Sequence, residues 1–217
     1  KIDDFDLIIF DRYKRRGILP AVYLDNVANY VAKGGAVLVA AGPDFAGADS
    51  IYRSPLARIL PAQPSARVIE EKYRPGVTEL GDRHPVTAGM QDSESWGSWL
   101  RQIDVETESG SILMTGVDDR PLLILDRVED GRVALLASDH AWLWSRGFDG
   151  GGPQLELLRR LAHWMMKEPE LEEEALWADA NGQTMRIIRR TLEEEIGPVT
   201  VTNPDGTTEV ITLDEVS

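Results

Sequence analysis

The fold is decided by residues 131–174, GRVALLASDHAWLWSRGFDGGGPQLELLRRLAHWMMKEPELEEE. Residues 132–138 at its start are almost entirely apolar, which predicts a strand buried on both faces of a sheet. Asp139 and His140 follow directly, so we expect their side chains at the carboxyl end of that strand. Ligands of open α/β sheets bind at this edge, and the pair is therefore the first candidate for a functional site.

A helix is predicted in the second half of the same stretch. Gly150, Gly151 and Gly152 predict a loop, and Pro153 suits the first turn of a helix. Apolar residues then recur at helical spacing and give the helix one apolar stripe, formed by Leu155, Leu158, Leu161, Ala162 and Met165. Strand, loop and amphipathic helix together predict half of a βαβ unit.

The composition is that of an acidic globular protein. The 217 residues include 23 Lys and Arg against 37 Asp and Glu, which gives a formal net charge of −14 at pH 7. This charge argues against nucleic-acid binding through a basic patch. No apolar run of about 18 residues is present, so no membrane span is predicted within this sequence. Cysteine is absent, which excludes thiol nucleophiles, disulfides and thiolate metal sites.

The preceding part of the chain predicts further strands around this stretch. Apolar runs predict strands over residues 5–10, 36–41, 66–73, 111–114 and 121–125, with a helix over residues 19–32. Glu129-Asp130-Gly131 is a hairpin turn signal between the strands at 121–125 and 132–138. We therefore expect an α/β fold.

The end of the chain has a different character. Residues 183–192, 199–203 and 208–213 are strand-like, and Pro204-Asp205-Gly206 is a strong turn signal between the last two. We predict an α/β domain over residues 1–176, followed by a β-rich segment over residues 177–217 that begins a truncated second domain. The sequence starts at Lys1 without an initiator Met, so we interpret it as a fragment of a longer protein.

The order of these elements resembles the class I glutamine amidotransferase-like superfamily. That resemblance implies a flavodoxin-like parallel sheet flanked by helices. It also implies a nucleophilic Cys on a strand-to-helix turn and a catalytic His after a late strand. The turn VLVAAGPDFAG at residues 37–47 puts Ala41 near the position of the nucleophile, and His140 falls near that of the catalytic His. The loop RHPVTAG at residues 83–89, which contains His84, looks like a histidine-proline loop of the trehalose-utilisation branch.

Three segments resemble more closely a family of large, little-characterised bacterial inner-membrane proteins that are described as glutamine amidotransferase-like. The segments are RHPVT at 83–87, SDHAWLWSRGFDGGGP at 138–153 and RRLAHWMMKEPELEEEAL at 159–176. In that family the domain is a soluble insert between transmembrane helices, and a β-rich segment follows it. The resemblance implies a membrane-tethered, periplasmic domain whose partners are proteins or other domains of the parent membrane protein.

The sequence departs from the superfamily at the positions that carry its chemistry. Ala41 replaces the nucleophile, and Trp142 stands where active members place a Glu two residues after the His. The thiol mechanism is therefore excluded. The first functional hypothesis is a non-catalytic amidotransferase-like domain, without a cofactor, that serves as a binding or assembly module of a bacterial membrane protein. The alternative is a hydrolase or small-molecule-binding enzyme that uses Asp139 and His140, joined by His84, with or without a metal.

Glycine-containing turns supply the candidate ligand-binding residues. Gly42 and Asp44 lie in the turn after the strand at 36–41, but the G-x-S-x-G pattern of a serine nucleophile is missing. Gly151 and Gly152 precede a helix and could present backbone N–H groups to an anion. The alternative for these glycines is that they only permit the close approach of Trp144 and Phe148 to the sheet.

The remaining candidates concern metals and partner proteins. Three His residues without Cys are few for a zinc site, so no metal site is predicted. Tryptophan is enriched at binding hot spots, and an exposed partner surface is one interpretation of Trp142, Trp144 and Trp164 with Met165 and Met166. Packing of the same residues in the core is the other.

Overall fold

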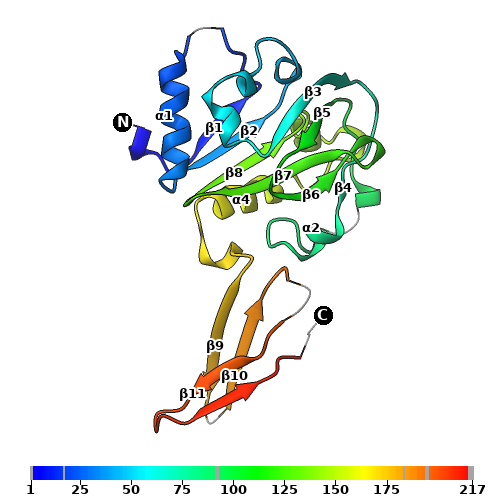
Figure 1. Ribbon diagram of the computed structural model, residues 1–217. Helices are drawn as coiled ribbons and strands as arrows, with labels where there is room; N and C mark the ends of the chain where they lie inside the picture. Colours follow the sequence, from blue (N-terminus) through cyan, green and yellow to red (C-terminus); the bar gives the residue numbers. More distant parts are fainter. Residues whose placement is uncertain (1, 17, 91–92, 183, 194–195, 215–217) are drawn as a thin grey trace. The chain divides into compact units, whose positions relative to one another are not determined.

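A six-stranded mixed sheet lies at the centre of the first part of the chain, in the order β1-β2-β8-β7-β6-β4 (Figure 1). The bounds are β1 Ile8–Asp11, β2 Ala36–Ala40, β8 Gly131–Leu136, β7 Pro121–Val128, β6 Ser111–Thr115 and β4 Gly76–Val77. Strands β1, β2 and β8 run parallel, whereas β7, β6 and β4 each pair antiparallel with the preceding strand in this order. The computed structural model describes residues 2–214 except 17, 91–92, 183 and 194–195.

The predicted flavodoxin-like parallel sheet is wrong. Strands β7 and β8 are joined by a two-residue turn in which Val128 pairs with Gly131 and Glu129 adopts a φ of 52°. Such a short connection can join only antiparallel strands. The apolar run of β8 suggested a parallel sheet because its residues are buried on both faces, but a covered central strand of a mixed sheet is buried in the same way.

Helices α1 (Ala21–Ala32) and α4 (Gln154–Met165) pack on opposite faces of the sheet. The alternation of side chains along β2 shows this division, because Val37 and Val39 join the cluster that contains α1, whereas Leu38 joins the cluster that contains α4. The buried residues of α4 are Leu157, Leu161, Trp164 and Met165. Leu155, which we placed on the inner stripe, is exposed instead.

Smaller elements complete the two apolar layers. A two-stranded antiparallel sheet of β3 (Ala62–Ile69) and β5 (Gln102–Thr107) contributes to the α1 face, while α2 (Glu79–Arg83) and α3 (Trp142–Ser145) contribute to the α4 face. Short 3-10 helices lie at Ile2–Asp4, Pro43–Ala46, Ile51–Arg53, Pro55–Arg58, Ser93–Ser95, Val117–Asp119, Phe148–Gly150 and Pro169–Leu171. No helix within the described residues is long and apolar enough to cross a membrane.

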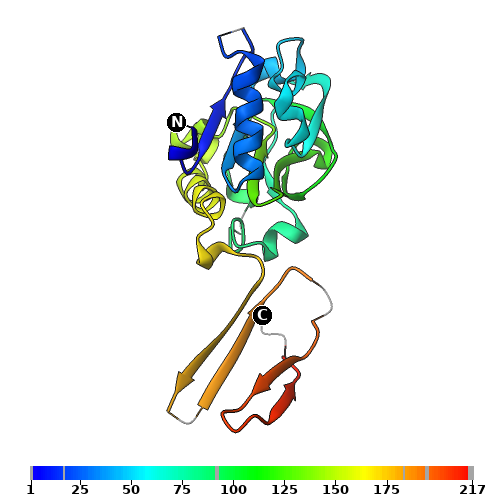
Figure 2. The same ribbon diagram turned by 60° about the vertical axis from the view of Figure 1, so that its left-hand side comes forward.

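The chain divides into two compact units, Lys1–Leu171 and Glu172–Ser217. The second unit consists of two antiparallel hairpins, β9 (Ala175–Asn181) with β10 (Thr184–Arg190), and β11 (Val199–Thr202) with β12 (Thr208–Ile211) (Figure 2). The division lies close to the boundary predicted between residues 176 and 177. Whether the second unit begins a longer domain stays a prediction. Residue 183, where we placed the start of a strand, lies outside the described residues. Residues 1 and 215–217, at the ends of the predicted domains, lie outside them as well.

Candidate functional site

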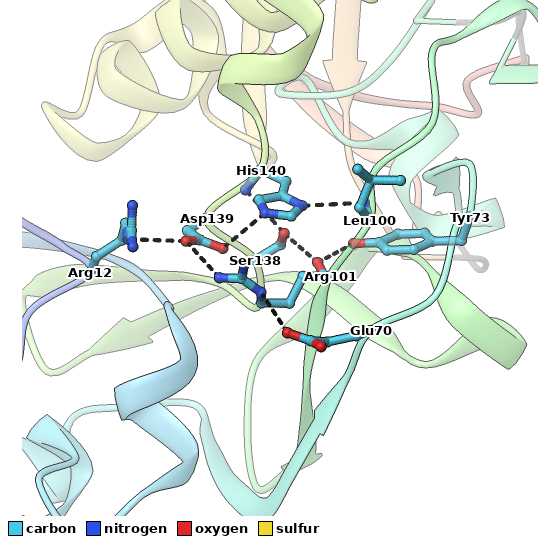
Figure 3. Close-up of polar contacts among 8 residues, drawn as sticks. All are labelled: Arg12, Glu70, Tyr73, Leu100, Arg101, Ser138, Asp139 and His140. Carbon is cyan, nitrogen blue, oxygen red and sulfur yellow. Dashed lines mark hydrogen bonds and ion pairs between the residues drawn. The ribbon is translucent and has the colours of Figure 1, made fainter. Parts of the chain in front are cut away.

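The carboxyl ends of β1, β2 and β8 bring three distant segments together at one edge of the sheet. Arg12 follows β1, Gly42 follows β2, and Ser138, Asp139 and His140 follow β8. Because the three strands are parallel neighbours, the Nε atom of Arg12 lies 3.0 Å from Asp139 Oδ2 (Figure 3). A Cβ atom added to Gly42 would lie 3.3 Å from the Cβ of Arg12, so Gly42 also borders this cluster.

Asp139 is the buried centre of the cluster, with a side chain that is 2% exposed. Its Oδ2 atom lies 3.0 Å from Arg12 Nε and 3.4 Å from Arg101 Nη1, so two guanidinium groups compensate one buried carboxylate. Its Oδ1 atom is 3.7 Å from His140 Nε2 and accepts no hydrogen bond within the part of the chain that the structure describes. The contacts of Asp139 thus hold two arginine side chains at the sheet edge.

Burial favours the neutral form of the His140 ring, in which Nδ1 accepts a hydrogen bond and Nε2 carries the proton. Its Nδ1 atom accepts a hydrogen bond from the backbone N–H of Leu100 at 3.2 Å, so the proton of the neutral ring is on Nε2, which faces Asp139 Oδ1 (Figure 3). Burial lowers the pKa of His140, and the nearby Asp139 carboxylate offsets only part of that effect. An imidazole in this state has no free lone pair with which to accept a proton from a substrate.

Ser138 and Tyr73 fix the chain around Arg101. The hydroxyls of Ser138 and Tyr73 both donate hydrogen bonds to the backbone carbonyl of Arg101, at 2.7 Å and 3.1 Å. The Ser138 hydroxyl also accepts a hydrogen bond from the backbone N–H of His140 at 3.1 Å, so its contact with His140 is through the main chain. Burial raises the pKa of Tyr73, which keeps this residue a neutral hydrogen-bond donor.

The position that sequence resemblance assigned to the nucleophile, Ala41, directly follows β2 and carries no reactive group. Ala41 is buried, and its backbone N–H donates a hydrogen bond to the carbonyl of Leu136 at 2.8 Å. Asp44 lies in the 3-10 turn Pro43–Ala46 and forms an ion pair with Lys14 at 2.8 Å. The ligand-binding role suggested for Gly42 and Asp44 stays a prediction.

His84 lies at the other end of the sheet from His140. Its ring packs edge-on against Trp164 at 5.9 Å, and Trp164 in turn packs under the guanidinium of Arg132, near the start of β8. Since β8 has six residues, its two ends are separated by about 20 Å. His84 and His140 therefore cannot act on one substrate atom. Among the described residues, no group of three or more His, Cys, Asp and Glu side chains is placed to hold a metal ion.

Gly151 and Gly152 border a buried tryptophan. A Cβ atom on Gly152 would lie 2.6 Å from the ring of Trp144, and the carbonyl of Gly151 accepts a hydrogen bond from the backbone N–H of Gly97. The indole N–H of Trp144 donates to the Gly97 carbonyl at 2.6 Å. Close packing on Trp144 explains Gly152, and the positive φ of 76° explains Gly151. Their suggested role in anion binding stays a prediction.

The tryptophans of residues 131–174 differ in exposure. Trp144 and Trp164 are buried in the core with Met165, whereas Trp142 is 49% exposed and packs edge-on against His140 at 6.4 Å. Only Trp142 among these three is therefore available to a ligand or partner at the candidate site. Sequence reasoning missed Arg12 and Arg101, because neither belongs to a motif and only the sheet topology brings them to Asp139.

Comparisons with known proteins show a shared fold. No family model and no curated protein matches the sequence. Similar solved structures include Cytoplasmic Protein STM3548 from Salmonella typhimurium, with a TM-score of 0.62 and 17% identity over 76% of this chain and 73% of that chain. Cytoplasmic Protein STM1381 from Salmonella typhimurium LT2 has a TM-score of 0.61 and 23% identity over 75% of this chain and 73% of that chain. A beta-galactosidase from Rahnella sp. R3 has a TM-score of 0.52 and 14% identity over 94% of this chain but 29% of that chain.

These findings correct the expectations that came from sequence resemblance. None of the three structures named above carries the name of a glutamine amidotransferase, and the mixed sheet differs from the fold that the superfamily implied. The two Salmonella structures are named cytoplasmic proteins, and those names do not support the expected periplasmic location. At these identities the likenesses establish the fold and say nothing about activity.

Proposed function

We propose that the first unit is a non-catalytic binding module whose binding surface is the carboxyl edge of β1, β2 and β8. The observation that carries this proposal is the state of His140, whose Nδ1 accepts from Leu100 N–H and whose Nε2 faces Asp139. General base catalysis needs a nitrogen within reach of a substrate proton, and neither ring nitrogen is available. The exposed groups at the same edge are Arg12 and Trp142, which are residues that bind rather than react.

A hydrolytic role for Asp139 and His140 has less support. The 3.7 Å between Asp139 Oδ1 and His140 Nε2 exceeds hydrogen-bond distance, and the Ser138 hydroxyl contacts the main chain of His140 and not its ring. A catalytic triad needs the nucleophile on one ring nitrogen and the carboxylate on the other. Here a backbone N–H occupies the nitrogen that the nucleophile would need.

The test combines a binding assay with an activity assay on the whole chain. A thermal-shift panel of divalent metals, glutamine, sugars, nucleotides and organic acids should contain a ligand that stabilises the protein. At 100 times its dissociation constant a ligand contributes about 2.7 kcal/mol, which is a shift of roughly 5–10 °C for a unit of this size. Ester, amide and phosphate-ester substrates should show no turnover above the buffer rate. Turnover that disappears in His140→Asn would overturn the proposal.

A further inference from the structure

The inference concerns which ligand the edge binds, and it starts with Arg12. Arg12 has a φ of 49°, a left-handed conformation that residues other than glycine rarely adopt, and its backbone N–H donates to the Ala40 carbonyl at 2.9 Å. Only the Nε of its guanidinium contacts another described residue, which is Asp139, and the side chain is 61% exposed. The two terminal nitrogens of Arg12 therefore face solvent at the sheet edge.

Arg101 approaches the same carboxylate oxygen from the start of β5. Its Nη1 lies 3.4 Å from Asp139 Oδ2, and its buried Nε donates no hydrogen bond within the described chain. The next acidic group is Glu70, whose carboxylate is 3.8 Å from that Nε and whose side chain is 74% exposed. Glu70 is thus a loose, solvated partner of Arg101 that a better anion can displace (Figure 3).

Two guanidinium groups meet one buried carboxylate at this edge. Arg12 and Arg101 both contact a single oxygen of Asp139, and the second carboxylate near them is the exposed Glu70. Lys14, Arg15 and Arg16 follow Arg12 in sequence, within a chain of net charge −14. Lys14 is neutralised by Asp44 and Asp49, and Arg15 donates to the Arg53 carbonyl, whereas Arg16 is exposed. An arginine whose second partner is a solvated carboxylate can exchange that partner for an anionic ligand.

Trp142 adds an exposed apolar surface next to His140. Its ring is 49% exposed and lies edge-on to His140, the residue after Asp139. A flat tryptophan face binds planar apolar groups, and an arginine fork binds carboxylate or phosphate with two parallel hydrogen bonds. The two features together suit a molecule with an oxyanion at one end and a planar group at the other.

We propose that the edge binds a small organic oxyanion, a carboxylate or a phosphate ester, with its anionic group between Arg12 and Arg101 and its planar part on Trp142. This inference rests on the proposed function. The anion takes the place of Glu70 beside Arg101 and binds the terminal nitrogens of Arg12, while Asp139 holds both guanidinium groups from the buried side.

Titration calorimetry on the whole chain tests the inference with benzoate, phenyl phosphate and the neutral benzamide. We expect one or both anions to bind and benzamide to bind at least about tenfold more weakly, because a charge-assisted hydrogen bond contributes roughly that factor. The anion that binds more tightly shows whether the site prefers carboxylate or phosphate. Equal binding of benzamide and the anions, or no binding of either anion, would overturn the inference.

Two variants and a control variant test whether the anion binds at Arg12 and in the place of Glu70. Arg12→Gln should weaken anion binding by about tenfold or more, and Glu70→Gln should strengthen it by roughly twofold to fivefold because the competing carboxylate is removed. Arg83→Gln, an exposed arginine at the end of α2, is the matched control and should change nothing. Circular dichroism checks that each variant is folded, and the Glu70 variant keeps the test valid if Arg12→Gln is unstable.

The two proposals fail in different ways. Weaker or unchanged anion binding in Glu70→Gln would overturn the anion site, even if Arg12→Gln lost binding through a change in folding. If only a neutral ligand from the thermal-shift panel binds, the oxyanion inference is wrong while the binding module stands. If turnover depends on His140, the binding module itself is wrong.

Discussion

His140 has a structural role that a pair of substitutions can isolate. Its Nδ1 is the acceptor for the backbone N–H of Leu100, and removal of an acceptor from a buried donor costs about 1–3 kcal/mol. We expect His140→Ala to lower the free energy of unfolding by this amount. His140→Asn should lower it less, because the Asn carboxamide oxygen occupies nearly the same position as Nδ1. Urea unfolding followed by circular dichroism compares the two, and equal losses would contradict the role of this hydrogen bond.

The same histidine should make stability depend on pH. Burial lowers the pKa of His140 below its ordinary value of 6.5. The unfolded chain then takes up this proton at a higher pH than the folded chain, so the stability that neutral His140 contributes is complete above about pH 6.5 and is lost as the pH falls through the folded pKa. Urea unfolding at pH 7.5, 6.5 and 5.5 should show a decline in wild type that is smaller in His140→Asn.

Asp149 and Glu156 titrate at lower pH, so they do not contribute to a decline in stability between pH 7.5 and 5.5. Hydrogen bonds from Ser98 and Lys72 lower the pKa of Asp149 to about 2, and hydrogen bonds from Arg159 and Arg160 lower that of Glu156 to about 2. Their contribution is present above their ordinary values of 3.8 and 4.5 and disappears only at lower pH. A decline between pH 6.5 and 5.5 that is equal in wild type and His140→Asn would show that His140 is not its source.

Among the elements, the loop before α4 is determined by packing against Trp144. The ring of Trp144 cannot retreat, because its N–H bonds to Gly97 and it contacts Trp96 and Trp99 at centroid distances of 5.2 Å and 4.8 Å. A Cβ atom on Gly152 would lie 2.6 Å from this ring. We expect Gly152→Ala to destabilise the protein by about 1–3 kcal/mol, as other overpacked sites do.

Gly47→Ala is the matched control for this substitution. The nearest atom to its new Cβ would be the Asp44 carbonyl oxygen at 3.5 Å, an ordinary contact, and Gly47 has a φ of −98° that alanine adopts freely. The free energy of unfolding of the Gly47→Ala variant should stay within about 0.5 kcal/mol of wild type. A similar loss in both variants would mean that the replacement of a loop glycine by alanine, and not the contact with Trp144, causes the loss at Gly152.

Local sequence signals predicted the elements better than their pairing. The apolar runs at 36–41 and 132–138 became β2 and β8, and the amphipathic pattern after Pro153 became α4. The Glu129-Asp130-Gly131 signal correctly placed a hairpin, and that hairpin is incompatible with the all-parallel sheet that we inferred from resemblance. The pairing of strands depends on tertiary contacts that apolar periodicity does not encode. The local sequence pattern therefore could not predict the order of strands in the sheet.

The candidate site was predictable only in part, for the same reason. Asp139 and His140 were recognised because they directly follow a buried strand. Arg12 and Arg101 are distant in sequence from Asp139 and carry no motif. Arg12 reaches Asp139 because β1, β2 and β8 are parallel neighbours, whereas Arg101 precedes β5, whose Ile103 N–H donates to the Ala137 carbonyl after β8. His84 was expected near His140, but its place beside Trp164 is fixed by packing of α2 and α4.

At the scale of the whole molecule, stability resides in the first unit. The two buried apolar clusters consist entirely of residues from Lys1–Leu171, and no described residue of the second unit is buried. The second unit instead exposes Leu176, Met185 and Val210 on two-stranded hairpins. Isolated two-stranded hairpins are marginally stable in water, so the second unit has little free energy of its own.

Two measurements follow from this division. Hydrogen exchange should be slow for the amides of β8 and α4 and fast throughout β9, β10, β11 and β12, because exchange from hairpins without a buried face needs little opening energy. A chain that ends at Leu171 should unfold within about 2 °C of the full chain, since the loss of exposed hairpins changes the free energy by less than about 1 kcal/mol. A midpoint more than about 5 °C lower, or slow exchange in β9 and β10, would mean that the second unit is stabilised by burial and contributes to the stability of the first.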